Sequence, residues 1–438
     1  MVLTEDMELV MNLVQNTQDN VFITGKAGSG KTTFLKYLIE HSGKKCMVTA
    51  PTGIAAINAG GVTLHSLFGI PFGPITPYDH LENKFSEYKV ELLLQMEVLI
   101  IDEISMVRPD ILDVVDRKLR WVYESDEPFG GVQIVMFGDL FQLPPVTKSQ
   151  EIKILSNFYD DFFFFNALVF KRTGFHVVEL TKIFRQTDPK FINILNNIRN
   201  YQVTSDELEI LSELRDRQIS KNYDGEYIHI CTHKAEVEKI NADKLGKQDI
   251  KTYEATIKDK FPESSIPCDL HLKLRVGARV MSLVNDAQKG YYNGMLGVVK
   301  ELKNNVVTVC MDNGQTIKFE RHTWSNTQYI LKENEIVKEE IGSCTQFPLT
   351  LAWAITIHKS QGLTFDKIAI HVSRTFCPGQ LYVALSRCRT LEGIISDAFI
   401  TKRMIIPEYA LIDFERAYKA EDNYYCLLYT SPSPRDTR

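Results

Sequence analysis

The chain has 438 residues, of which 44% are hydrophobic and 24% are charged, and its formal net charge at pH 7 is −6. This composition is typical of a soluble globular protein, and the length allows two to four domains of about 150 residues. The acidic balance excludes a basic field over the whole protein, but it does not exclude a local basic footprint for nucleic acid.

The first residues, "MVLTEDMELVMNLV", predict an amphipathic helix capped by Thr4. Acidic residues stand where a secretory signal carries positive charge, and no uncharged stretch reaches the ~18 apolar residues of a membrane span. The eight cysteines are scattered without a C-x-x-C pair, which is typical of reduced thiols in the cytosol. We therefore expect a cytoplasmic protein, nucleoid-associated if bacterial, with no membrane contact.

Short apolar strands alternate with helical patterns over the first 180 residues. The expected strands are 21–24, 46–50, 98–102, 134–138 and 176–180. This alternation favours a parallel sheet covered by helices. Proline, glycine and aromatic residues crowd 68–85, which we interpret as an excursion from this core.

A phosphate-binding loop follows the first strand. The stretch "GKAGSGKT" matches G-x-x-x-x-G-K-[ST] between a strand and a helix, which is the context that the motif requires. Its backbone amides would converge on phosphate oxygens, Lys31 would contact the β- and γ-phosphates of ATP, and Thr32 would bind Mg²⁺. The nucleotide-binding residues expected here are Gly25, Gly28, Ser29, Gly30, Lys31, Thr32 and Thr33.

Two later strands end in residues suited to the same site. "VLIIDEIS" supplies Asp102 for the magnesium ion and Glu103 to orient or deprotonate the attacking water. "IVMFGDLFQLPPV" places Gln142 two residues before Pro144 and Pro145, which restrict the loop. The Gln142 amide can donate to the γ-phosphate or to the attacking water, and so sense the third phosphate. A plain exit from the strand is the alternative interpretation.

A second α/β region begins near residue 177. Within it, "HICTH" alternates His229, Cys231 and His233, which would share one face of a strand. They could ligate zinc, but no fourth ligand is spaced to join them. A strand entering the helix of "THKAEVEKIN" is the favoured interpretation.

Alternating apolar and polar residues interrupt this region from about 276 to 345 and predict a small antiparallel barrel, with Asn313-Gly314 as a hairpin turn. Within 271–300 the only acidic residue is Asp286, whereas five residues are basic: Lys273, Arg275, Arg279, Lys289 and Lys300. This excess of positive charge suits either a nucleic-acid contact or a solvated charged face. The α/β pattern then resumes to about residue 420. The serine- and proline-rich residues 421–438 predict a disordered tail or an artefact of cloning or sequence assembly.

Two arginines are candidates to assist phosphoryl transfer. Arg185 lies in "LTKIFRQTD" and Arg387 in "GQLYVALSRCRT". Positive charge at the transferring phosphoryl group accelerates its transfer. If both arginines reach the γ-phosphate, ATP would bridge two domains and its hydrolysis would let a cleft open and close. A surface ion pair is the alternative for each arginine.

Together, "GKAGSGKT", "TAPTGIAAINAGGVTLHS", "IIDEISM", "GDLFQLPPV", "LTKIFRQTD", "LAWAITIHKSQGLTFD" and "GQLYVALSRCRT" resemble the ordered motifs of superfamily 1 DNA helicases. The segment "EISMVRPDILDVVDRKLRWV" resembles a signature helix of the Pif (petite integration frequency) family, in its RecD-like branch. The resemblance implies an α/β fold with two RecA-like P-loop cores. The first core would be 1–66 and 86–176 with a wedge insert at 67–85, and the second 177–275 and 346–420 with a β-barrel insert at 276–345.

The resemblance also implies a function. The family translocates 5′-to-3′ on single-stranded DNA and unwinds duplex DNA, using ATP and Mg²⁺, and some members resolve G-quadruplex DNA. Its members act in replication, recombination, repair and telomere maintenance. We expect a monomer whose protein partners the sequence does not identify.

The motifs carry the family's residue roles onto this chain. Lys31, Glu103, Gln142, Arg185 and Arg387 match the catalytic residues, and Gly362 matches a glycine near the phosphates. The expected DNA contacts are Thr52, Gly53, His65, Ser66, Phe68, Thr232, His233, Thr356, His358, Lys359 and Ser360. Met7 stands where the family often has a glutamine that reads adenine, so this chain departs from the pattern there.

Several alternatives stay open at this level. Phe68 and Phe72 suit either DNA stacking or packing of their own loop, and Tyr291 and Tyr292 suit support of the barrel better than DNA contact. A related RecD-type or relaxase-associated helicase is the closest competing enzyme. A nucleotide switch that binds DNA without unwinding it, and an RNA-binding or scaffold protein with a degenerate ATPase, are the competitors from other classes.

Overall fold

The computed structural model describes residues 3–80, 85–186, 188–216, 227–286, 288–372 and 377–420. The chain forms two compact units. Unit 1 comprises the described parts of Met1–Phe184, Thr327–Glu339 and Glu408–Arg438, and unit 2 those of Arg185–Asn326 and Glu340–Pro407. The expected tail at 421–438 and residues 81–84 of the expected wedge insert lie outside the described residues.

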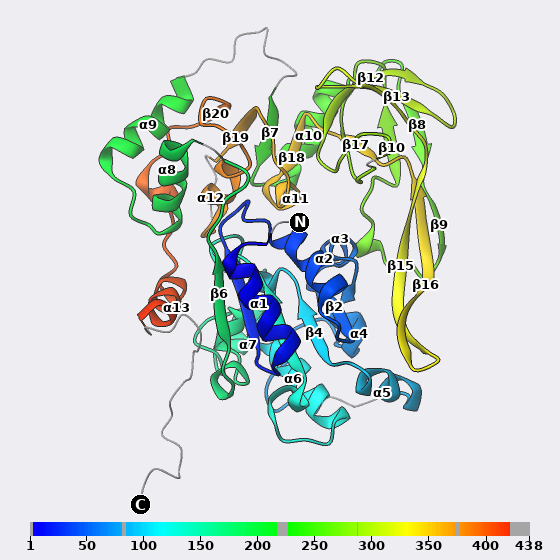
Figure 1. Ribbon diagram of the computed structural model, residues 1–438. Helices are drawn as coiled ribbons and strands as arrows, with labels where there is room; N and C mark the ends of the chain where they lie inside the picture. The colour runs from blue at the N-terminus through cyan, green and yellow to red at the C-terminus, as the bar shows by residue number, and fades with distance from the viewer. Residues whose placement is uncertain are drawn as a thin grey trace, which may run out of the picture. The chain divides into compact units, whose positions relative to one another are not determined.

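Unit 1 is built on a parallel sheet (Figure 1), which confirms the expected α/β class. Over the described residues, its strand order is β3-β2-β4-β5-β1-β6. The strands are β1 (Val21–Gly25), β2 (Cys46–Ala50), β3 (Val62–Thr63), β4 (Val98–Ile101), β5 (Gln133–Phe137) and β6 (His176–Leu180). Every residue of β1, β4 and β5 is buried, because helices cover both faces of such a sheet.

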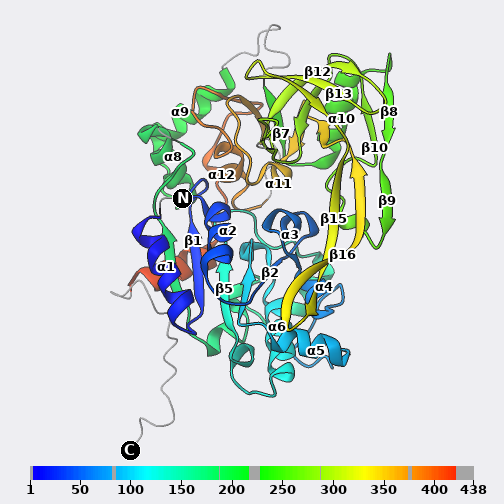
Figure 2. The same ribbon diagram turned by 45° about the vertical axis from the view of Figure 1, so that its right-hand side comes forward.

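The helices of unit 1 follow from the sequence pattern. They are α1 (Glu5–Asn16), α2 (Lys31–His41), α3 (Gly53–Ala59), α4 (Leu64–Phe68), α5 (Glu87–Leu94), α6 (Pro109–Val122), α7 (Ser149–Leu155) and α13 (Tyr409–Ala420). The helices α1 and α2 pack against β1, as Figures 1 and 2 show, and share its apolar core. In the part of the chain that the structure describes, no helix has both the length and the apolar character needed to cross a membrane.

Unit 2 contains a second parallel sheet, with the order β18-β7-β19-β20 over its described strands. The strands are β7 (Ile228–Cys231), β18 (Ala354–Thr356), β19 (Ile368–His371) and β20 (Ile394–Ser396). Its helices are α8 (Pro189–Arg199), α9 (Ser205–Asp216), α10 (Lys234–Leu245), α11 (Ile357–Ser360) and α12 (Gln380–Leu385).

The antiparallel part of unit 2 is larger than the expected insert at 276–345. Its described sheets have the orders β10-β8, β14-β13-β12-β11-β17 and β15-β16-β9. The strands are β8 (Lys251–Glu254), β9 (Thr256–Asp259), β10 (His271–Leu274), β11 (Arg279–Ser282), β12 (Leu296–Leu302), β13 (Val307–Met311), β14 (Thr316–Phe319), β15 (His322–Lys332), β16 (Glu335–Gln346) and β17 (Leu349–Leu351). Antiparallel pairing therefore starts at Lys251 and ends at Leu351, and Gly314 adopts φ +85° in the expected hairpin turn.

Two segments that are distant in sequence complete unit 1. The end of the β15–β16 hairpin joins it because the Tyr329 hydroxyl accepts from the Val48 amide at 2.8 Å. The helix α13 joins it through Phe414, whose ring stacks on Phe165 with centroids 4.3 Å apart. The expected second core, 177–275 and 346–420, therefore differs from unit 2 at both ends. Residues 177–184, which include most of β6, and the last helix belong to unit 1.

Candidate active site

The phosphate loop connects β1 to α2 and depends on its glycines. Gly28 and Gly30 have φ of +86° and +84°, a region that residues with a Cβ rarely adopt. A Cβ on Gly25 would lie 2.7 Å from Ser29 Oγ, so the loop closes tightly there. Lys31 begins α2, and its ammonium donates to the Gly25 carbonyl at 2.7 Å. The lysine therefore lies along the loop whose amides would bind phosphate.

The acidic pair follows β4 directly. Asp102 Oδ1 accepts from the Glu103 amide at 2.9 Å, and the Asp102 amide donates to the Thr49 carbonyl of β2. Burial raises the pKa of Asp102 to about 6, against the opposing effect of the Lys31 charge. Glu103 adopts φ 52° and ψ 43°. Such left-handed backbone in a non-glycine residue costs energy and is concentrated at functional sites.

The glutamine follows β5, where a buried aspartate orients it. Gln142 Nε2 donates to Asp139 Oδ2 at 3.1 Å, and Asp139 Oδ1 accepts from the Phe141 amide at 3.2 Å. Asp139 is 1% exposed. A Cβ on Gly138 would lie 2.8 Å from Ile104 Cγ2, so the glutamine and acidic segments pack closely. The sequence analysis did not predict that Asp139 orients Gln142, although an acidic residue three positions before the glutamine was a usable signal.

These three segments leave adjacent parallel strands. The order β4-β5-β1 places the carboxyl ends of the three strands at one edge of the sheet. Ligands of open α/β sheets bind at this edge. Unit 1 therefore brings Lys31, Asp102 and Gln142 to one region, as the sequence predicts.

An aromatic side chain that sequence reasoning missed lies beside the phosphate loop. The Phe184 amide donates to the Gly28 carbonyl at 2.9 Å, and a Cβ on Gly30 would lie 3.5 Å from the Phe184 ring. This ring is 53% exposed. Met7, at the position of the family's adenine-reading glutamine, is buried in the core of unit 1.

Unit 2 brings the two candidate arginines together. Arg185 donates to the Ser386 carbonyl at 3.2 Å and to the Gly362 carbonyl at 3.3 Å. Arg387 donates to the Ser360 carbonyl at 3.2 Å and to Ser386 Oγ at 2.8 Å. Both guanidinium groups thus contact the 360–362 segment and Ser386, so the expected grouping with Gly362 is present within this unit.

Burial and a neighbouring amide shape this arginine cluster. Burial lowers the pKa of Arg185 to about 10, a value at which it stays charged at neutral pH. Arg387 is 1% exposed. Gln186 Nε2 donates to the Ser386 and Cys388 carbonyls at 3.0 and 3.1 Å, which fixes the loop that holds Arg387. Sequence reasoning missed this role of Gln186.

The expected DNA contacts of unit 1 follow β2 and β3. Thr52 caps α3 by accepting from the Ala55 amide, and it is exposed. His65 stacks on the Phe72 ring with centroids 5.2 Å apart, and Phe72 is 88% exposed. The structure corrects the expectation for Phe68, which is 0% exposed and packs in the core, so its ring has no face for a base. Gly53 and Ser66 lie in the first turns of α3 and α4.

The corresponding residues of unit 2 follow β18 and β7. Thr356 caps α11 by accepting from the Lys359 amide at 3.1 Å, and His358 and Lys359 are exposed. Thr232 Oγ1 lies 2.8 Å from His233 Nδ1 just after the neighbouring strand β7. The structure also corrects the expectation that the Ser360 side chain contacts DNA. Its hydroxyl is buried and donates to the Ile357 carbonyl at 2.7 Å.

A sequence profile of the PIF1-like helicases matches residues 2–209. ATP-dependent DNA helicase Pif1 of Campylobacter jejuni is 32% identical, with 84% of this chain and 86% of that protein covered. The chain belongs to the PIF1-like helicase family. It is also 35% identical to ATP-dependent DNA helicase PIF1 of Danio rerio, covering 95% of this chain but only 64% of that protein.

Solved PIF1-like structures extend the similarity. A Bacteroides sp. Pif1 in complex with ADP-AlF4 is 85% identical and covers 97% of this chain and 99% of its own, with a TM-score of 0.93. A Bacteroides Pif1 in complex with ADP-AlF3 and ssDNA is also 85% identical with the same coverage, and its TM-score is 0.72.

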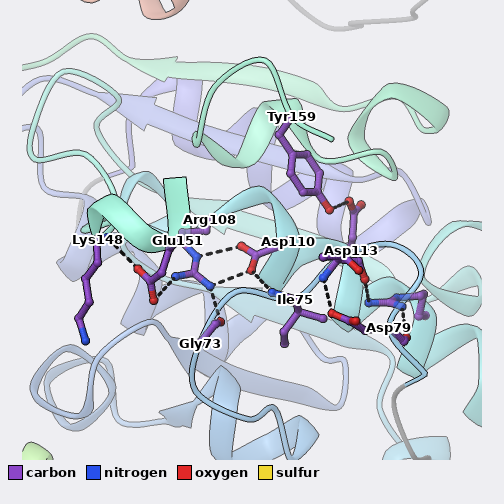
Figure 3. A network of polar contacts seen from close by, with 11 residues as sticks. Gly73, Ile75, Asp79, Arg108, Asp110, Asp113, Lys148, Glu151 and Tyr159 are labelled. Carbon is purple, nitrogen blue, oxygen red and sulfur yellow. Dashed lines mark hydrogen bonds and ion pairs between the residues drawn. The ribbon is translucent and has the colours of Figure 1, made fainter. Parts of the chain in front are cut away.

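The helix that resembles the PIF1-like signature, α6, anchors the expected wedge insert (Figure 3). Arg108 donates to Asp110 at 2.9 and 2.7 Å and to the Gly73 carbonyl at 2.6 Å. Asp110 also accepts from the Ile75 amide at 3.1 Å, and Arg108 pairs with Glu151 of α7 at 3.3 Å. Asp110 is 0% exposed. The insert that carries Phe72 is therefore held by a buried, charge-assisted network.

The basic stretch at 271–300 is partly explained by structural contacts. Arg279 forms an ion pair with Asp312, Lys289 pairs with Glu320 at 2.8 Å, and Arg275 donates to the Leu245 carbonyl at 2.7 Å. Tyr291 lies in the apolar core of the antiparallel region, whereas Tyr292 is 52% exposed. These contacts favour the solvated-face interpretation of the stretch.

Proposed function

We propose that the chain is an ATP-dependent DNA helicase that moves 5′-to-3′ on single-stranded DNA and unwinds duplex DNA. The observation that carries this proposal is the grouping of Lys31, Asp102 and Gln142 at adjoining strand ends of unit 1. The paired arginines of unit 2 and the family membership support it. A site for nucleotide alone would not need Gln142 and both arginines.

The residues of unit 1 fit ATP with Mg²⁺. Asp102 is a half-buried carboxylate whose raised pKa is partly offset by the nearby Lys31 charge, and hard oxygen ligands of this kind suit magnesium. Thr32 and Asp102 would hold the ion, which when bound neutralises charge on the β- and γ-phosphates. Lys31 and the loop amides would hold the same phosphates.

Four side chains would then act on the γ-phosphate. Glu103 would orient the attacking water and accept its proton, and its strained backbone holds the carboxylate at the strand end. Gln142, fixed by Asp139, would contact the water or the γ-phosphate. Arg185 and Arg387 would supply positive charge as negative charge develops on the transferring group.

The adenine base would stack on Phe184. The support is an exposed ring directly beside the phosphate loop. Since Met7 is buried and offers no amide, recognition of the base would depend on this ring and on backbone groups.

DNA would be held through its phosphates by the residues that follow β2, β3, β7 and β18. Thr52, Thr232 and Thr356 each stand at or just beyond the end of a parallel strand, and hydroxyls and amides there would contact phosphates without reading sequence. The similar Bacteroides Pif1 in complex with ssDNA supports single-stranded DNA as the ligand. Phe72 would stack on a base or separate the duplex.

The finer parts of the proposal rest on the family. They are the 5′-to-3′ polarity, action on G-quadruplex DNA, a monomeric active form, a cytoplasmic location, and work in replication, recombination, repair and telomere maintenance.

One experiment tests activity and polarity together. Matched duplexes with a 5′ or a 3′ single-stranded tail are incubated with the protein, ATP and Mg²⁺, and strand separation is followed by fluorescence. We expect unwinding of the 5′-tailed duplex only. DNA-stimulated ATP hydrolysis without separation of either duplex would instead support a translocase or a switch.

A further inference from the structure

Four segments of unit 2 bring metal-ligating side chains to one point. Single ligand atoms of Cys231, Glu236 and His371 lie within 4.8 Å of one another. His371 Nδ1 is 3.1 Å from Glu236 Oε1 and 3.8 Å from Asp397 Oδ2. Cys231 is fully buried, and the other three side chains are half-buried. The group therefore combines a thiol, an imidazole and one carboxylate. Asp397 borders it as a second carboxylate, and its other oxygen accepts from the Val372 amide at 3.0 Å.

The topology of the second parallel sheet produces this grouping. Cys231 ends β7 and pairs in register with His371, which ends the neighbouring strand β19. Glu236 lies in the first turn of α10, directly after β7, and Asp397 directly follows β20, the next strand. All four residues thus lie at the carboxyl edge of one sheet, although 166 residues separate the first from the last (397 − 231).

We propose that Cys231, His371, Glu236 and Asp397 form a zinc site. Zinc in proteins takes four ligands from cysteine, histidine and carboxylates, with bonds of about 2.0–2.3 Å, which in a tetrahedron separate the ligand atoms by about 3.5 Å. The distances of 3.1 and 3.8 Å around His371 Nδ1 bracket that value. The thiol and imidazole favour zinc over magnesium or calcium, which prefer oxygen ligands.

His229 supplies the supporting contact that such a site needs. Its Nδ1 lies 2.8 Å from His371 Nε2. With the proton of His371 on Nε2 and donated to His229, the Nδ1 lone pair of His371 points to the carboxylates and is available to a metal. A ligating histidine usually donates its other ring N–H in this way. On binding, the Cys231 thiol would release its proton and bind as thiolate.

The sequence pattern pointed to a different set of ligands. "HICTH" suggested His229, Cys231 and His233 with no fourth ligand. His233 instead directly precedes α10, and its Nδ1 lies 2.8 Å from Thr232 Oγ1. It is therefore a nearby histidine outside the proposed site and can serve as a control. His371 and Asp397 could not be found from spacing, because only the pairing of β7, β19 and β20 brings them close.

The site has a consequence for the neighbouring residues. Thr232 and His233, proposed DNA contacts, directly follow Cys231. A metal bound by four segments would hold this edge of the sheet in one arrangement and stabilise unit 2. Metal binding itself does not depend on helicase activity, so its test is independent of the proposed function.

Cobalt substitution tests the proposal on the full chain. Protein freed of metal by a chelator is titrated with Co²⁺, which reports thiolate ligation through a sulfur-to-metal charge-transfer band. We expect one Co²⁺ per chain with that band and with intense tetrahedral visible bands, and displacement of both by Zn²⁺. Cys231→Ser should abolish the charge-transfer band, and His229→Gln should weaken binding about 10- to 100-fold.

Matched variants make the test decisive. His233→Gln and Cys310→Ser remove the same ligand types outside the cluster and should leave the cobalt spectrum unchanged. Glu236→Gln, on a half-exposed helix position, guards against a Cys231→Ser protein that fails to fold, and it should weaken binding. A charge-transfer band that survives Cys231→Ser in folded protein, binding indifferent to Glu236→Gln, or no uptake at all would overturn the proposal.

Discussion

At the scale of single residues, the two adjacent acids after β4 have different proposed roles: Asp102 binds the metal ion and Glu103 accepts a proton. Glu103 is held in left-handed backbone next to the half-buried Asp102, so its backbone has a defined position beside the proposed metal ligand. Glu103→Gln keeps this geometry but removes the proton acceptor. We expect DNA-stimulated ATP turnover to fall at least about 100-fold, the usual contribution of general base catalysis.

The measurement separates binding from chemistry. Fluorescent-nucleotide titration should give Glu103→Gln an ATP affinity close to that of the parent, whereas Lys31→Ala should lose binding and unwinding together. Normal steady-state turnover by Glu103→Gln would remove Glu103 from the catalytic role.

Arg387 makes a second prediction at this scale. Because its proposed contact strengthens only as charge develops, Arg387→Ala should keep ATP affinity within a modest factor and lose turnover about 10³-fold or more. Its side chain also bonds the Ser360 carbonyl, so a thermal melt must establish that the variant is folded. Weakened ATP affinity with unchanged kcat would assign Arg387 to substrate binding instead.

Phe184 gives a prediction that the sequence did not offer. If its ring stacks on adenine, Phe184→Ala should raise the KM for ATP about 5- to 150-fold, from the ~1–3 kcal/mol typical of base stacking on an aromatic ring. Phe184→Tyr, which keeps an aromatic face, is the control and should stay near the parent value. Equal effects of both substitutions would exclude stacking.

At the scale of elements, α6 and the wedge insert are coupled through Arg108. Arg108→Ala would leave Asp110 buried without its cation and free the Gly73 carbonyl, and breaking a buried pair costs about 3–5 kcal/mol. We expect unwinding to fall strongly while ssDNA-stimulated ATP hydrolysis is largely retained, because the network joins the insert to α6 and α7 and includes none of the strand ends.

Lys153→Ala, which removes an exposed cation of α7, is the matched control for Arg108→Ala. It should change neither activity. Parallel loss of hydrolysis and unwinding in Arg108→Ala would show that the network supports the whole unit and not the insert alone.

The elements also show how far the sequence predicts the structure. The strands β1, β2, β4, β5 and β6 and the phosphate loop were predictable because the signals are local: an apolar run, a glycine pattern and the lysine that follows. The two-residue strand β3 was not predicted. The Phe184 contact with Gly28 and the Arg387 contact with Ser360 were not predictable either, because each joins segments that are distant in sequence. The role of Asp139 was missed although its contact with Gln142 is local. Phe68 illustrates the same limit, since the sequence suited either DNA stacking or packing, and the structure shows that it is buried.

At the scale of the whole molecule, the units do not follow the order of the chain. Unit 1 takes its last helix from residues 409–420, and Phe414 places its ring against Phe165 and within 5.9 Å of the Phe170 ring centroid. Sequence periodicity assigned this helix to the second core, because nothing in its own pattern identifies the surface that covers it. The aromatic residues in 163–175 that pack against this helix could equally pack against another apolar element, so their sequence does not identify α13 as the partner.

Phe414→Ala tests this arrangement. Phe414 is half-buried, so its truncation should cost roughly 2–3 kcal/mol, less than the 3–5 kcal/mol of a fully buried phenylalanine. Because the loss lies in unit 1, hydrogen exchange should accelerate in β1 and β6 and stay unchanged in β7 and β19. Tyr409→Ala, at a position of α13 that is 70% exposed, should leave both sheets protected. If exchange becomes faster in β7 and β19, or stays unchanged in all four strands, α13 does not stabilise unit 1 through Phe414.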